Sequence, residues 1–187
     1  MKNKRILLIS LSVILALGMF GFTACGSKAG KGDSGTDVPG TDETAAQSYR
    51  VTLFYANEEY IATGDESLEK FKVYESEMTS KPGEAYMDAL ELLKTSPEKG
   101  YSTVITDQIK FNDVYLEGDT VNVDFDSNGL NGGSLEETFL ISQIVDTLMN
   151  SFKEVKQVQF LVDGEAAETL MGHVDTAAPF TKDLFTE

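Results

Sequence analysis

Three consecutive stretches decide the fold: residues 120–126 (TVNVDFD), 134–152 (SLEETFLISQIVDTLMNSF) and 155–164 (VKQVQFLVDG). In the first stretch apolar and polar residues alternate, which is typical of a strand with one buried face. The second stretch carries apolar residues at helical spacing, and the third is rich in β-formers and reaches an Asp-Gly turn. A strand, an amphipathic helix and another strand therefore form the predicted centre of the domain.

The helix predicted from residue 134 has the most regular apolar stripe in the chain. The stripe consists of Leu140, Ile141, Ile144, Val145, Leu148, Met149 and Phe152. The opposite positions include Gln143, Asp146 and Asn150, so we expect one buried and one wet face. Ser134 and Glu137 have the spacing of a capping box, in which both residues bond to the first turn. This pattern predicts a helix that lies on a sheet.

Elements outside this centre complete the predicted order β-β-α-β-β-α-β. They are strands over residues 50–56, 68–79 and 109–116, and a helix that starts at Ser80-Lys81-Pro82-Gly83-Glu84 and ends by Pro97 and Gly100. A turn at Glu117-Gly118-Asp119 joins two of the strands into a hairpin, and a short last strand is placed near Leu170. We expect one α+β domain with two amphipathic helices packed on one face of a mixed sheet.

Residues 1–24 have the features of a secretory signal peptide. Lys2, Lys4 and Arg5 precede residues 6–22, which are apolar apart from two serines and two glycines. A core helix of a cytosolic protein would show polar positions at helical spacing, and this run does not. A positive segment followed by an apolar run indicates export.

The end of this segment, Phe22-Thr23-Ala24-Cys25-Gly26-Ser27, resembles a bacterial lipobox, with Phe22 where Leu is usual. The resemblance implies that Cys25 receives a diacylglycerol thioether and that cleavage occurs before it. Two alternatives remain at this point. Cys25 is an ordinary cysteine after a signal peptide that is cleaved elsewhere, or the apolar run stays as a membrane anchor near the short limit for spanning.

Residues 25–48 comprise Cys25 and a linker of Gly, Ser, Thr, Asp, Lys and Ala, in which Val38 is the largest aliphatic residue. Such a composition buries too little surface to offset the entropy of ordering, so it predicts a disordered tether. Its root-mean-square span is roughly 25 Å. Residues 49–187 remain for a single folded domain.

The charge balance excludes two classes of partner. The chain has 15 basic and 31 acidic residues, and removal of the three basic residues before Cys25 leaves 12, for a net charge of about −19. Nucleic acids are bound through Lys and Arg, so no nucleic-acid partner is expected. Adsorption to anionic lipid is equally disfavoured. We therefore expect an extracytoplasmic protein, held at the outer face of the cytoplasmic membrane by lipid on Cys25.

The inventory of reactive residues is small, and we predict no catalytic, cofactor-binding or metal site. His173 is the single histidine and lies in a glycine-flanked loop, and acylation would consume the thiol of Cys25. Asp124, Asp126 and Asn128, followed by Gly129, match the first half of a calcium loop. The bidentate Glu expected at the twelfth position is replaced by Leu135, so calcium is a weak alternative.

The region from about residue 51 to residue 180 resembles the GerMN domain family. The resemblance rests on residues 121–126 (VNVDFD), 143–148 (QIVDTL) and 155–164 (VKQVQFLVDG), followed by the tail to Phe180. It implies a non-catalytic interaction domain, found in lipoproteins of spore-forming and other monoderm bacteria. It also implies a fold similar to ring-building modules. Family members often carry the domain in tandem, whereas this chain has room for one copy.

These observations predict a membrane-anchored lipoprotein whose interaction domain acts in sporulation, spore germination or envelope assembly, and not an enzyme. Its expected partner is an envelope protein or a second copy, which would associate through an exposed strand edge. The alternative is a protein that binds peptidoglycan, or a wall hydrolase that uses a pair of carboxylates.

Overall fold

The computed structural model describes residues 45–181. The predicted signal peptide, Cys25 and most of the linker lie outside these residues. The elements are β1 (Gln47–Asn57), α1 (Glu58–Thr63), β2 (Phe71–Ser80), α2 (Ala85–Leu92), β3 (Tyr101–Ser102), β4 (Phe111–Glu117), β5 (Thr120–Phe125), α3 (Ser134–Ser151), β6 (Gln157–Val162), β7 (Glu165–Ala166) and β8 (Phe180–Thr181). The α+β class and the order of the seven main elements are confirmed. The expected strand near Leu170 is wrong, because β7 and β8 lie on either side of that position.

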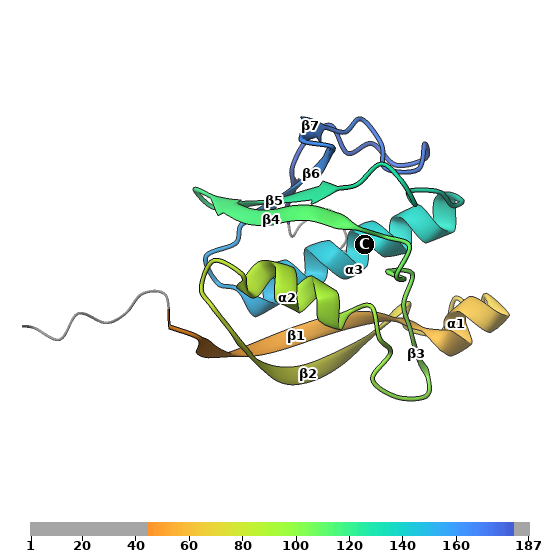
Figure 1. Ribbon diagram of the computed structural model, residues 1–187. Coiled ribbons are helices and arrows are strands. Elements are labelled where there is room, and N and C mark those ends of the chain that lie inside the picture. Colours follow the sequence, from red (N-terminus) through yellow and green to blue (C-terminus); the bar gives the residue numbers. More distant parts are fainter. Residues whose placement is uncertain (1–44, 182–187) are drawn as a thin grey trace, which may run out of the picture. The chain divides into compact units, whose positions relative to one another are not determined.

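The described strands form two sheets, where the sequence predicted one. The first sheet has the order β2-β1-β3 and is antiparallel, and the second has the order β4-β5-β6-β7 with β8 paired to β6. The second sheet is mixed, because β5 and β6 are joined through α3 and run parallel, whereas β4 and β5 form a hairpin. Figure 1 shows α2 and α3 between the two sheets. The helices therefore have a sheet on both sides, and not on one.

The core fills the space between the sheets. In β1 the alternating residues Val51, Leu53 and Tyr55 are buried, and they belong to one cluster with the apolar residues of both helices and of the second sheet. The hydroxyl of Tyr55 donates to the carbonyl oxygens of Leu92 at 2.9 Å and Thr95 at 3.1 Å, at the end of α2. This face of β1 is the inner face, and the side chains between these residues point outward.

Three polar side chains of α3 form hydrogen bonds with the backbone of β1 at Thr52 and Phe54, on the side away from β2. Thr147 Oγ1 accepts from Phe54 N at 3.0 Å, and Gln143 Nε2 donates to Phe54 O at 3.0 Å. Ser151 Oγ accepts from Thr52 N at 3.0 Å and donates to Thr52 O at 3.3 Å. Four residues of helix rise about 6 Å and two residues of strand about 6.8 Å, so the helix side chains match the strand repeat. Thus α3 takes the place of a neighbouring strand.

This position buries α3 around most of its circumference. Its buried residues are Glu137, Phe139, Leu140, Ile141, Ser142, Gln143, Ile144, Val145, Thr147 and Leu148. The apolar stripe is confirmed, but the expectation that Gln143 faces water is wrong, because its amide is used by the edge of β1. Asn150 is exposed, as predicted.

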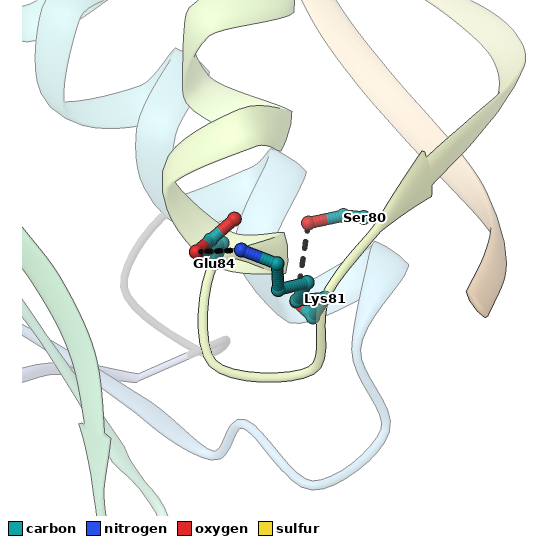
Figure 2. A network of polar contacts seen from close by, with 3 residues as sticks. All are labelled: Ser80, Lys81 and Glu84. Atoms are coloured by element: carbon teal, nitrogen blue, oxygen red, sulfur yellow. Dashed lines mark hydrogen bonds and ion pairs between the residues drawn. The ribbon is translucent and has the colours of Figure 1, made fainter. Parts of the chain in front are cut away.

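The first turns of both long helices differ from the expected capping. At α2 the Ser80 hydroxyl donates to Lys81 O at 3.1 Å, and Lys81 Nζ pairs with Glu84 Oε1 at 2.9 Å (Figure 2). Ser80 therefore does not cap the helix, which begins only at Ala85. At α3 the capping interaction is shifted by one residue, because Glu136 Oε2 accepts from Gly133 N at 3.1 Å.

The predicted Asp-Gly turn is confirmed between β6 and β7, where Val162 pairs with Glu165. Asp163 and Gly164 have φ values of 51° and 83°, the left-handed conformation that this tight turn requires. In the part of the chain that is described, no helix is long and apolar enough to cross a membrane.

Candidate functional site

A hollow lies on the outer face of the first sheet, between β2, the loop before it and α3. It has a volume of about 650 Å³, and Phe54, Leu68, Phe71 and Val73 provide its apolar lining. A second hollow of about 310 Å³ adjoins it, shares Phe71 with it and reaches Leu135 at the start of α3. We call these two hollows together the outer groove.

Strand register explains why apolar side chains gather there. Phe54 pairs with Val73 across β1 and β2, and both belong to the outward-pointing set because Leu53 and Tyr55 point into the core. Thr52 and Glu75 form the next outward pair, joined by a 3.1 Å hydrogen bond from the threonine hydroxyl. The outer face is therefore apolar at one end and polar beyond it.

Two apolar side chains of the outer groove are half exposed. Val73 has a relative exposure of 47% and Leu135 of 51%. In the second hollow the ring of Phe139 in α3 lies 5.0 Å from that of Phe71, measured between centroids, and 6.2 Å from that of Tyr60 in α1. These packed aromatic rings form a buried part of the lining, whereas Val73 and Leu135 remain accessible.

The loop before β2 forms one wall, is bonded to the end of β1 and has a local hydrogen bond of its own. Asn57 Nδ2 donates to Glu69 O at 2.8 Å, and Asn57 N donates to Lys70 O at 2.9 Å. Within the loop Ser67 N donates to Asp65 Oδ1 at 2.9 Å, and hydrogen bonds from Ser67 hold the pKa of Asp65 below its usual value. These hydrogen bonds fix the conformation of the loop that forms this wall.

The charges on this wall are mostly negative. Glu66 and Glu69 line the outer groove and are exposed, and Lys70 is the cation among its lining residues. Glu75 extends the acidic character along the same face of β2. The outer groove therefore combines apolar side chains with an acidic rim.

The residues of the calcium half-motif are engaged in local hydrogen bonds. Asp124 Oδ1 accepts from Gly164 N at 2.9 Å. Asp126 Oδ1 accepts from the backbone and side-chain nitrogens of Asn128 at 2.8 and 2.7 Å. Gly129 has a φ of 99°, and a Cβ there would lie 2.2 Å from the carbonyl oxygen of residue 108. Turn geometry and close packing thus explain the pattern. Within residues 45–181, no three His, Cys, Asp or Glu side chains are placed to hold a metal ion.

Sequence reasoning missed the role of Glu137, which is fully buried. Its Oε1 accepts from the backbone nitrogens of Leu170 and Met171, each at 2.8 Å, and its Oε2 from those of His173 at 2.7 Å and Val174 at 3.1 Å. The predicted capping role is wrong, because Glu136 fills it. Buried carboxylates require such partners, so Glu137 fixes the loop after β7 onto α3. The ring of His173 contacts Gly132 O at 3.3 Å.

Comparison with known proteins identifies the family of the domain. The family Germane, described as "Sporulation and spore germination", matches residues 52–168. Among proteins of curated function, none matches at a significant level.

Among solved structures, the chain is similar to the first GerMN domain of the sporulation protein GerM from Bacillus subtilis. The identity is 15%, the match covers 71% of this chain and 97% of that chain, and the TM-score is 0.56. The tandem GerMN domains of the same protein match with 18% identity over 83% of this chain and 48% of that chain, with a TM-score of 0.49. A candidate lipoprotein of Clostridium perfringens matches with 15% identity over 74% of this chain and 89% of that chain, with a TM-score of 0.49. The family match over residues 52–168, with the fold of a solved GerMN domain, shows that this chain belongs to the Germane family of sporulation and spore germination domains.

Proposed function

We propose that this chain is a lipoprotein, anchored through Cys25 on the outer face of the cytoplasmic membrane. Its GerMN domain is a non-catalytic interaction module that acts in sporulation, spore germination or envelope assembly. The sequence features that support the anchor are the signal peptide pattern, the lipobox around Cys25 and the 23-residue linker after it. The acidic composition leaves acylation as the means of membrane residence.

The observation that carries the interaction function is the half exposure of Val73 and Leu135 in the outer groove. Burying the remaining exposed surface of each side chain would contribute roughly 1 kcal/mol. A hollow that is lined by accessible apolar side chains and packed aromatic rings is typical of a protein-binding surface.

The engagement of polar side chains supports a non-catalytic role. Asp124 and Glu137, which are both buried, accept hydrogen bonds from backbone nitrogens of the domain itself. Carboxylates that are used in this way hold loops in position. A hydrolase would instead direct a carboxyl pair toward its substrate.

Replacement of the acylated cysteine tests the anchor. Cys25→Ala should release the protein from the membrane fraction or leave an unprocessed precursor, as seen by fractionation and by the mass of the chain. Ser27→Ala, which changes a neighbouring residue outside the acylation position, is the control. Processing and fractionation of Cys25→Ala like the unchanged chain would refute the anchor.

Deletion and turnover experiments test the role of the domain. Deletion of the chain should impair spore formation, germination or envelope integrity in its host, and purified peptidoglycan should stay intact with the full chain. Turnover of peptidoglycan that is lost when paired Asp or Glu residues are changed would establish a wall hydrolase instead.

A further inference from the structure

The outer groove presents two kinds of surface to an occupant. Phe54, Phe71 and Val73 offer an apolar surface from two adjacent strands, with Leu135 beyond them on α3. Glu66 and Glu69 stand on the wall beside this surface. An occupant that satisfies both must bring apolar side chains and positive charge together.

Four occupants lack this combination. The linker of this chain carries Lys28 and Lys31, but it has no aromatic residue and no aliphatic larger than Val38, so it lacks side chains that would fill the apolar lining. A second copy brings the same acidic rim and, after removal of residues 1–24, the same net charge of about −19, so the two copies would repel each other. Anionic lipid and anionic wall polymers would meet Glu66 and Glu69 with like charge.

We propose that the outer groove binds a segment of another envelope protein that presents apolar side chains flanked by Lys or Arg. This inference rests on the proposed interaction function and names the chemistry of the partner. The apolar side chains pack on Phe54, Phe71 and Val73 and cover Leu135. The basic residues lie against Glu66 and Glu69, where they speed association and exclude acidic segments.

Site-specific cross-linking of the full chain in its host tests the inference. A photoreactive benzoyl-phenylalanine replaces Val73 or Leu135 in separate variants. The control replaces Tyr115, which is 39% exposed on β4 in the other sheet. We expect both groove positions to capture the same protein, with at least tenfold higher yield than position 115. The captured peptide should contain apolar residues with Lys or Arg within a few positions.

Charge reversal separates electrostatic matching from chance proximity. Glu66→Lys combined with Glu69→Lys should lower the cross-linking yield from position 73 roughly tenfold. The matched control combines Glu98→Lys with Glu117→Lys, which changes the net charge equally at two exposed positions outside the groove lining. Thermal unfolding of both double variants checks that the domain stays folded.

The outcomes distinguish this inference from the function on which it rests. Capture of an acidic segment, a second copy of the chain, lipid or peptidoglycan from position 73 would overturn the inference. So would an equal effect of the two charge reversals. A protein captured from position 115 and not from the groove would overturn the inference but retain the interaction function. No captured protein from any position, together with no effect of deletion, would overturn both.

Discussion

Replacing the buried carboxylate of Glu137 should be among the most destabilising single changes in the domain. Its two oxygens accept four backbone hydrogen bonds at 2.7 to 3.1 Å from the loop over residues 170–174. Glu137→Gln keeps the size of the side chain, so it leaves no cavity. The amide oxygen still accepts two of the bonds, but the amide NH2 then faces the other two backbone N–H groups.

The structure sets the expected magnitude. Two hydrogen bonds to a charged group are lost, at about 1.5 to 3 kcal/mol each, so the free energy of unfolding should fall by about 3 to 6 kcal/mol. Domains of this size have a total stability of about 5 to 15 kcal/mol. The variant should therefore be marginally folded, with its loop released before the core.

Urea unfolding of the purified chain measures this change. With a denaturant slope of about 2 kcal/mol per M, the midpoint should fall by about 1.5 to 3 M. Hydrogen exchange at residues 170–174 should speed up in the variant. Glu168→Gln makes the same chemical change at an exposed position and should shift stability by less than about 0.5 kcal/mol. Equal midpoints for the two variants would refute the structural role of Glu137.

Three further predictions concern other polar groups. Thr147→Val keeps the side-chain shape but leaves Phe54 N without its acceptor, so urea unfolding should show a loss of about 1 to 3 kcal/mol. Burial raises the pKa of Tyr55 to about 12 from 10.0. Because the pKa is higher in the folded state, the contribution of the neutral Tyr55 hydroxyl to the free energy of unfolding is present below pH 10 and is lost as the pH rises toward 12. Absorbance titration of wild type and Tyr55→Phe should show both the raised pKa and this loss of stability. Hydrogen bonds from Ser127 lower the pKa of Asp163 below 3.8. Its contribution to the free energy of unfolding is therefore present at neutral pH and is lost as the pH falls through the pKa of the folded state. The stability difference between wild type and Asp163→Asn at pH 7 should therefore shrink in acid.

Sequence reasoning located the main elements because their local signals agree with the fold. The Asp163-Gly164 turn and the apolar stripe of α3 are local signals that a single turn or helix determines alone. The strand β5 lies where it was predicted, but the expectation of one buried face is wrong, because Asn122 and Asp124 are buried together with its apolar residues. The number of sheets could not be predicted in the same way. Whether strands join one sheet or two depends on pairing between distant segments.

Periodicity also misjudged the polar side of α3. Gln143 was placed on the wet face, but its amide donates to the edge of β1, some 90 positions away in sequence. Likewise Glu136 and Glu137 are adjacent, and only the path of the loop over residues 170–174 decides which one caps the helix and which one is buried. In both cases the polar side chain bonds to a backbone group of a distant segment. Every residue has such backbone groups, so the sequence does not reveal which one is the partner.

The outer groove was not predicted for a related reason. Alternation in β1 predicts that Phe54 and Leu53 lie on opposite faces of the strand, but it does not predict which face the helices cover. The half-exposed side chains Val73 and Leu135 come from separate elements, and they line adjoining hollows only in the folded domain. The lipobox around Cys25, in contrast, is recognised from a few consecutive residues without any knowledge of the fold. It lies outside the described residues.

Thiol accessibility on intact cells tests most directly the claim that a membrane-anchored domain uses the outer groove to bind a partner. With Cys25 acylated, a cysteine introduced at Val73 or Tyr115 is the single free thiol. A membrane-impermeant maleimide should label Tyr115→Cys equally fast on intact cells and in the purified chain. It should label Val73→Cys several-fold more slowly on cells than in the purified chain. Equal rates for Val73→Cys in both settings would contradict an occupied groove, and no labelling of either variant on intact cells would contradict the extracytoplasmic location.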